Sequence, residues 1–190
     1  MAVSKIEEGQ LFSKLNRVFR THGYEGASLS IISGALGLGR ASLYYRFPGG
    51  KAEMVEALLA YVEETCMKNM FAPLREPGPV KERVERMARV IDEFYEGGHC
   101  ACLFETLSLG NQDNPFLSQV RRIFNAWVHA LAAVAREAGY PDGEARRAAE
   151  KALVGIQGGL VFARASGDTG PFRRVLQELP DLLAGSGTTD

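Results

Sequence analysis

The sequence predicts an all-α protein of about nine helices, with a three-helix domain at the N-terminus followed by a larger helical bundle. Apolar residues recur at the spacing of a helix face along nearly the whole chain, and strand signals are scarce. Glycine and proline clusters separate the periodic segments. With 46% apolar and 24% charged residues over 190 positions, the composition is that of an ordinary globular protein.

The first predicted helix runs from about residue 4 to His22. Residues 4–7, Ser-Lys-Ile-Glu, form a capping box, in which a serine side chain and a glutamate three residues later satisfy free backbone N–H groups. The inward face of this helix carries Leu11, Leu15, Val18 and Phe19. We expect it to brace the two shorter helices that follow.

Residues 28–47 predict two short helices joined by a tight turn. Ser28 can cap a helix with Leu29, Ile32 and Leu36 on one face, and Gly37 suits the left-handed backbone of the turn. The second helix has the anchors Leu38, Leu43 and Phe47 and ends before Pro48. This pattern is typical of a helix-turn-helix, whose second helix enters the major groove of DNA.

Polar and aromatic residues are left to cover the outer surface of the second helix. Arginine and tyrosine there can donate to bases and phosphates, and a lysine at the start of the next helix adds a charge where backbone amides already favour phosphate. In an alternative reading, the Tyr44 ring packs under the turn and exposes only its hydroxyl. The predicted DNA contacts are Ser28, Arg40, Ser42, Tyr44, Tyr45, Arg46 and Lys51.

These residues resemble the TetR family of transcriptional regulators, whose signature combines Phe-x-x-x-Gly-Tyr, Ile-Ala, Gly-Val-Ser, Leu-Tyr-x-His-Phe and a following lysine. The matching positions are Phe19, Gly23, Tyr24, Ser28, Ile32, Gly37, Leu43, Tyr44, Phe47 and Lys51. Three positions differ: Ser33 replaces the usual alanine, Gly39 the serine that caps the recognition helix, and Arg46 a common histidine. The segments around 102–105, 127 and 157–159 are also similar to the LmrA-like subgroup of multidrug-resistance repressors.

Charge is unevenly distributed along the chain. Residues 1–52 contain seven Lys or Arg and three Glu, a net charge of +4, whereas the whole chain carries −1. A basic end joined to an acidic body fits a DNA-facing segment, although an unevenly charged solvated surface would have the same composition.

The body is predicted to contain six further helices. They span about 51–71, 80–96, 101–109, 113–138 and 143–166, and a last one starts near Pro171 and is disturbed by Pro180. We therefore expect a DNA-binding domain over residues 1–50, a ligand-binding and dimerisation domain over 51–184, and a flexible tail over 185–190.

Glycines on the helix over 143–166 predict a close helix contact. Each costs about 1 kcal/mol relative to alanine in a helix interior, so a close approach should offset them. The family resemblance implies a homodimer that reads a partly palindromic operator, while close packing inside one subunit is the alternative. The predicted interface residues are Gly155, Gly158, Gly159, Val161 and Leu176.

Aromatic residues in the body are candidates for a ligand pocket. The resemblance implies a small apolar or aromatic ligand that tilts the fourth helix and separates the two recognition helices; each aromatic residue could equally be plain core. Polar groups that could orient such a ligand include His99, Asn125 and Gln157. The predicted ligand contacts are Tyr61, Phe71, Phe94, Tyr95, Phe104, Phe124, Trp127, Gln157 and Phe162.

A cluster of His99, Cys100 and Cys102 leaves a second hypothesis open, a regulator that senses redox state or a soft metal. The cluster lacks a fourth ligand and the usual spacing of a zinc site, and two thiols two residues apart on a helix would face different sides. Buried small side chains are the simpler interpretation.

No catalytic set can be assembled, because His22, His99 and His129 have no nearby nucleophile or carboxylate in sequence, and no metal or cofactor is predicted. The N-terminus lacks a signal peptide and no apolar run approaches a membrane span, which predicts a cytoplasmic location. Besides the ligand-responsive repressor, a helical small-molecule-binding protein with little DNA affinity remains a third hypothesis.

Overall fold

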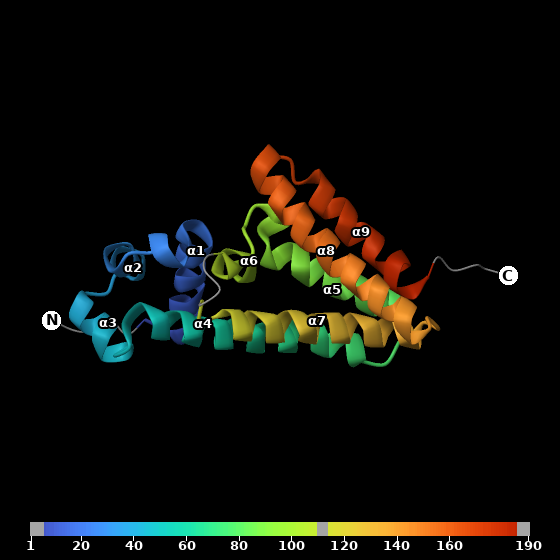
Figure 1. Cartoon of the computed structure of the whole chain (residues 1–190), viewed down its shortest axis with the longest axis horizontal. Helices are drawn as coiled ribbons and strands as arrows, with labels where there is room; N and C mark the ends of the chain where they lie inside the picture. The colour runs from blue at the N-terminus through green and yellow to red at the C-terminus, as the bar shows by residue number, and fades with distance from the viewer. Residues whose placement is uncertain (1–5, 110–113, 186–190) are drawn as a thin grey trace. The chain divides into compact units, whose positions relative to one another are not determined.

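The computed structural model describes residues 6–109 and 114–185, and every regular element within these ranges is helical (Figure 1). This confirms the all-α prediction. The elements are α1 (Glu8–Gly26), α2 (Leu29–Leu36), α3 (Arg40–Arg46), α4 (Gly50–Cys66), the π-helical η1 (Met67–Phe71), the 3-10 helix η2 (Ala72–Arg75), α5 (Val80–Phe94), the 3-10 turn η3 (Glu96–Gly98), α6 (Leu103–Ser108), α7 (Leu117–Glu137), α8 (Asp142–Ser166) and α9 (Gly170–Ala184).

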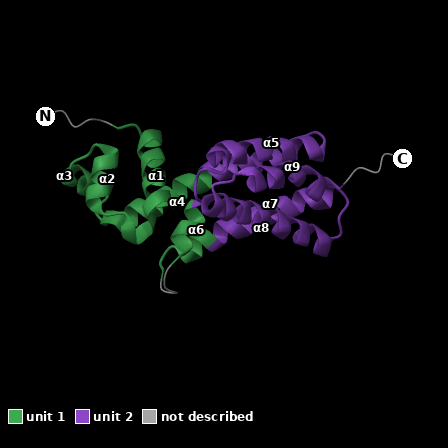
Figure 2. Ribbon diagram, turned by 90° about the horizontal axis from the view of Figure 1, so that it is seen from above, with its two compact units in different colours: residues 1–64, 103–120 green, residues 65–102, 121–190 purple. Residues whose placement is uncertain are grey.

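The chain forms two compact units, coloured separately in Figure 2. The first comprises residues 1–64 and 103–120; in it α1 packs against α2 and α6, and α2 against α3. The second comprises residues 65–102 and 121–190, and its α9 packs against both α5 and α8. Within the ranges described, no helix combines the length and apolarity needed to cross a bilayer.

The predicted anchors of the first three helices are buried, except that Leu29 of α2 is only half-buried. Leu11, Leu15 and Phe19 of α1 have no exposed surface, and Ile32 and Leu43 are likewise enclosed. Regular helical geometry in α1 stops at Gly23, which has φ of +66°, close to the predicted end at His22. Of the predicted capping box, Ser4 and Lys5 lie outside the described residues, and the Glu7 side chain makes no capping hydrogen bond.

Three predicted boundaries in the body are corrected. The helix after Gly50 changes from α to π winding at Met67 before reaching Phe71. Pro180 lies buried inside α9, and the helix continues past it to Ala184. The helix predicted from residue 113 begins at Leu117, since Asn114 forms a turn in which its Oδ1 accepts from the Phe116 N–H at 2.9 Å. Asp113 and residues 186–190 of the predicted tail lie outside the described ranges.

Candidate functional site

Hydrogen bonds hold both the start of α2 and the turn between α2 and α3. The Ser28 hydroxyl accepts from the Ile31 N–H at 3.3 Å, which caps α2 as predicted. Gly37 adopts φ of +66° and ψ of 25°, the left-handed conformation that ends the helix. The Ser33 hydroxyl donates to the Leu38 carbonyl at 2.5 Å, a bond that the family's usual alanine at this position would lack. The direction in which α3 leaves the turn is therefore well determined.

Helix α3 is seven residues long and exposes most of its surface. Leu43 anchors it, while Gly39 precedes it without a side-chain cap, as expected from the missing serine. Arg40 Nη2 donates to the Ser30 hydroxyl of α2 at 3.0 Å. Tyr44 is 47% exposed and Tyr45 is 91% exposed. The Tyr44 ring is thus not wholly buried under the turn.

A shallow hollow of about 440 Å³ lies beside α3. Its lining brings together Ser28 at the start of α2, Tyr44 of α3, and Gly49 to Lys51 at the start of α4. The first turns of α2 and α4 meet there, and the N-terminal end of a helix favours an anion such as a DNA phosphate. Three N–H groups at these helix starts already have acceptors: the Gly49 N–H donates to Glu53 Oε2 at 2.6 Å, the Gly50 N–H to the Phe47 carbonyl at 2.9 Å, and the Ile31 N–H to the Ser28 hydroxyl at 3.3 Å.

Lys51, one of the predicted DNA contacts, makes contacts within the chain. Its Nζ donates to the Tyr24 carbonyl at 2.6 Å and lies 4.3 Å from the centre of the Tyr24 ring. The Tyr24 ring also packs edge-on against the ring of Phe116, with the two centroids 5.0 Å apart. Burial raises the pKa of the Tyr24 hydroxyl, and the nearby Glu25 and Glu56 raise that pKa further. Lys51 therefore fastens the start of α4 to the end of α1.

The nine predicted ligand contacts do not share one environment. Tyr61 and Phe104 belong to the first unit, where Tyr61 stacks on Phe12 with centroids 4.6 Å apart. Phe71 and Trp127 pack together in the second unit at 5.9 Å, and Phe94 meets Tyr95 at 5.0 Å. Phe124 and Gln157 are half-buried residues of the second unit. Phe162 is 53% exposed on α8, which places it on the surface.

Two of these residues contain buried polar atoms that lack a hydrogen-bond partner within the described part of the chain. They are the Trp127 Nε1 and both the nitrogen and the oxygen of the Gln157 amide. Buried polar groups are nearly always paired with protein, water or ligand, so each of these atoms has hydrogen-bonding capacity available. These two side chains are the polar contacts that a ligand in the second unit would find.

The glycines of α8 face in different directions. A Cβ on Gly159 would lie 2.9 Å from the Phe172 Cα, and one on Gly155 would lie 3.1 Å from Val175, so both glycines allow α9 of the same chain to approach closely. Leu176 is buried as well. Gly158 has open space instead, and Val154, Val161 and Phe162 are exposed apolar neighbours on the same helix. We call Val154, Gly158, Val161 and Phe162 the outer face of α8.

Neither Cys100 nor Cys102 lies on a helix, because α6 begins at Leu103, two residues later than the predicted start at residue 101. All three cysteines are free thiols, and the Tyr95 hydroxyl donates to the buried Cys102 Sγ at 3.4 Å. Within the described ranges, no group of three or more His, Cys, Asp or Glu side chains is placed to hold a metal ion. A sensing role for Cys100 and Cys102 stays a hypothesis.

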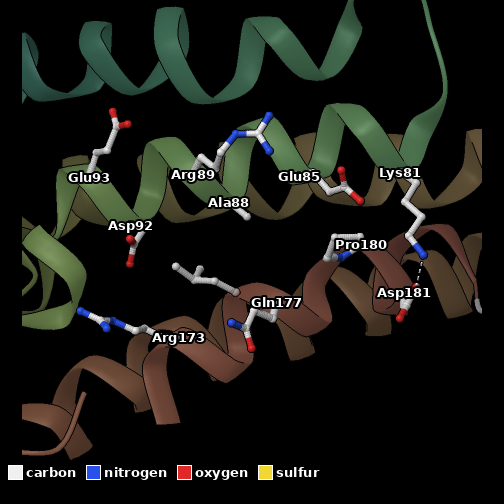
Figure 3. Close-up of a pocket in the computed structure, with 11 residues that line it drawn as sticks. Lys81, Glu85, Ala88, Arg89, Asp92, Glu93, Arg173, Gln177, Pro180 and Asp181 are labelled. Carbon is white, nitrogen blue, oxygen red and sulfur yellow. Dashed lines mark hydrogen bonds and ion pairs between the residues drawn. The ribbon is translucent and has the colours of Figure 1, made fainter. Parts of the chain in front are cut away.

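A groove of about 600 Å³ runs between α5 and α9 (Figure 3). Ala88, Leu176 and Pro180 supply its apolar surface, and a hydrogen-bonded ion pair from Lys81 Nζ to Asp181 Oδ1, 2.7 Å long, lies across one end. Hydrogen bonding to Asp181 raises the pKa of Lys81. Both side chains are more than half exposed, so this pair contributes little to stability.

Arg83 is a buried charged residue, 2% exposed, that was not among the predicted site residues. The signal was present: Arg83 precedes Met87 by four residues and therefore falls on the inward face of the predicted helix. A charged residue at such a position needs internal partners.

A short, exposed helix held by a fixed turn on two supporting helices defines a DNA-binding regulator of the helix-turn-helix class. The chain belongs to the TetR family of bacterial regulatory proteins: residues 12–58 match that family's model, and residues 84–178 match the C-terminal domain of LmrA/YxaF-like transcriptional regulators. It is thus a DNA-binding transcriptional regulator, and the subgroup resemblance seen in the sequence is confirmed.

Full-length relatives agree with this assignment. The HTH-type transcriptional regulator LmrA of Bacillus subtilis is 23% identical over 180 residues, covering 92% of this chain and 95% of that protein. YxaF of the same organism, an uncharacterized HTH-type regulator, is 23% identical over 178 residues, covering 90% and 92%.

Solved structures share the fold. A TetR transcriptional regulator from Legionella pneumophila superposes with a TM-score of 0.83 at 20% identity, covering 96% of this chain and all of that one. A TetR-family regulator from Agrobacterium tumefaciens gives 0.77 at 21% identity, covering 92% and 96%.

Proposed function

We propose that this regulator is a repressor that binds a partly palindromic operator as a homodimer and is released by a small molecule bound in its second unit. The observation that supports DNA binding is that α3 packs on α2 and exposes its outer surface, with Tyr45 91% exposed. In this proposal Ser28, Arg40, Ser42, Tyr44, Tyr45, Arg46 and Lys51 contact DNA, with residues 1–50 as the DNA-binding domain and 51–184 as the ligand and dimer domain.

The hollow beside α3 supports the assignment of phosphate contacts. Ser28 and Lys51 line it from two different helix starts, so one phosphate could receive hydrogen bonds from both. Tyr45 and Arg46 are exposed at the end of α3, where they would reach base edges and the backbone.

The outer face of α8 supports the dimer. Gly155, Gly159 and Leu176 pack within the chain, whereas Gly158 and Val161 are exposed beside Val154 and Phe162. Exposed apolar residues gathered on one helix usually mark a site of association. A second copy packed on this face by two-fold symmetry would place two recognition helices on one operator.

The ligand is proposed to bind among the aromatic residues of the second unit. The unpaired Trp127 Nε1 and Gln157 amide support this, since a ligand with a hydrogen-bond acceptor and donor would satisfy them.

The test is fluorescence anisotropy of duplexes tiled across the DNA upstream of the protein's own gene, at two salt concentrations. We expect tight binding to one tile, at two or four subunits per duplex. The variant Tyr45→Ala should keep the wild-type melting temperature and lose about tenfold or more in affinity for that tile, because a good base contact contributes about 1–3 kcal/mol. Weak and equal binding to every tile would contradict the proposal and favour a small-molecule-binding protein with little DNA affinity.

A further inference from the structure

Arg83 of α5 is the one buried charged side chain among the residues that the structure describes. Its Nη1 donates to the Leu74 carbonyl at 2.6 Å, and its Nη2 donates to Glu137 Oε1. The Nε–H is buried and has no partner in the described chain. A buried cation is costly unless its donors are matched, so this guanidinium is incompletely satisfied.

The donors that remain have a specific geometry. Nε and Nη2 lie along one edge of the planar guanidinium, the edge that binds both oxygens of a carboxylate at once. Glu137 occupies only one of the two positions. The Glu137 side chain is 54% exposed, so it can move into water when another carboxylate takes its place beside the buried Arg83.

Arg83 also lines a cavity of about 370 Å³ in the second unit. Phe71, Leu74, Ala130 and Val134 supply apolar walls. The volume is within the range of small-molecule sites, which combine apolar walls with a few polar groups. Phe71 ends the π-helical segment η1, and π-helical turns occur frequently at functional sites.

We propose that this cavity binds a small organic acid, whose carboxylate replaces Glu137 on Nε and Nη2 of Arg83 while its apolar part packs against Phe71 and Val134. Both donors along the edge would then be satisfied, and the charge of Arg83 would remain balanced. The apolar walls and the buried guanidinium together favour an amphipathic anion over a neutral or cationic compound. The inference rests on the proposed function in one respect, namely that a small molecule bound in the second unit releases the operator; here that molecule takes its polar contact from Arg83 instead of from Trp127 and Gln157.

Trp127 supplies a built-in reporter, because it is the only tryptophan of the chain and its ring lies 5.9 Å from that of Phe71. We would titrate the full-length protein at pH 7.5 with octanoate and benzoate, and with octanamide and benzamide as uncharged controls of the same shape. At least one acid should change Trp127 emission saturably, and its amide should bind about tenfold more weakly or worse, since hydrogen bonds to charged groups contribute about 1.5–3 kcal/mol.

Two variants should change the affinity in opposite directions. Glu137→Gln removes the competing carboxylate and should tighten acid binding by a few-fold or more, whereas Arg83→Met should abolish it. Arg83→Lys keeps the charge without the planar fork, so it should bind acid at least about tenfold more weakly than wild type. Melting curves identify variants that are unfolded, and Glu137→Gln provides the test if the Arg83 variants do not fold.

Equal binding of acid and amide, no saturable response to either acid, or an affinity unchanged in Glu137→Gln would each overturn the site. Operator binding is measured separately by anisotropy. If Trp127 responds as expected and no operator is bound, the proposed regulatory function fails and the acid site stands. If operator binding is found and neither acid binds, the site fails and the regulator stands.

Discussion

The side chains predicted to contact DNA differ in how strongly they are held within the chain. Lys51 donates to the Tyr24 carbonyl, and Arg40 donates to Ser30. Both therefore shape the DNA-binding unit as well as being candidates to bind phosphate. Tyr45 and Arg46 are exposed at the far end of α3, so substitutions there separate DNA affinity from folding.

Arg46→Ala should weaken binding to every DNA sequence and reduce the slope of log affinity against log salt by about one, because one phosphate contact is lost. The free energy of unfolding should change by less than about 0.5 kcal/mol, since the side chain is exposed. Anisotropy titrations at several salt concentrations give the slope. Lys51→Ala is the matched control, because it should lower both DNA affinity and the melting temperature. An unchanged slope would remove Arg46 from the set of contacts.

Relative to the family pattern, the segment between α2 and α3 gains one hydrogen bond and lacks one side-chain helix cap. Ser33 adds a hydrogen bond to the Leu38 carbonyl, while Gly39 leaves the first turn of α3 without a side-chain cap. Both differences lie at the same turn, and we infer that the stability gained from the Ser33 hydrogen bond partly offsets the stability lost with the missing cap at Gly39.

Gly39→Ser should stabilise the protein by a few tenths of a kcal/mol, because serine is a better cap than glycine. Gly39 already has the extended φ of −66° and ψ of 156° that a capping residue needs, and a Cβ there meets nothing within 4 Å. Urea unfolding with linear extrapolation measures the gain. Ser33→Ala, made in parallel, should lower stability by about 1 kcal/mol. A destabilised Gly39→Ser variant would show that α3 begins differently from the geometry described.

Two adjacent glycines of α8 provide a second test at the level of a helix. Gly159→Ala should destabilise the subunit by about 1–3 kcal/mol, because its Cβ would lie 2.9 Å from backbone of α9 and the two helices would have to separate. Gly158→Ala, the matched control, should stabilise it by up to about 1 kcal/mol, since a Cβ there has open space and alanine favours the helix. Urea unfolding measures the free energy of unfolding of both variants. Equal changes in the two variants would contradict the packing of α8 against α9.

Assembly is a property of the complete regulator, and it depends on surfaces that a single chain leaves exposed. The outer face of α8 carries Val154, Val161 and Phe162, three of the large apolar side chains that remain accessible within the described ranges. In the proposed dimer this face is covered, and operator binding requires the pair.

Phe162→Asp should therefore convert the dimer to a monomer and reduce operator affinity by orders of magnitude, because a buried unpaired carboxylate is costly at an apolar interface. The melting temperature extrapolated to low protein concentration should remain near that of wild type, since Phe162 is exposed in the subunit. Sedimentation velocity gives the oligomeric state. Leu109→Asp, a charge on an exposed apolar residue outside α8, is the control that should remain dimeric. A Phe162→Asp protein that still sediments as a dimer would place the interface elsewhere.

The sequence by itself determined the helical class, the helix-turn-helix with its glycine turn, and the family, because each depends on local signals: apolar spacing, caps, and the residues that a tight turn tolerates. Gly37 and Leu43 could be assigned in this way. The assignments that only the tertiary structure decided concern partners distant in the chain. Spacing shows that Gly155 and Gly159 allow a close approach but does not say which helix approaches, and here it is α9 of the same chain. Likewise, the partners of Arg83 come from Leu74 and from Glu137, 54 residues away, a juxtaposition that only the packed fold creates.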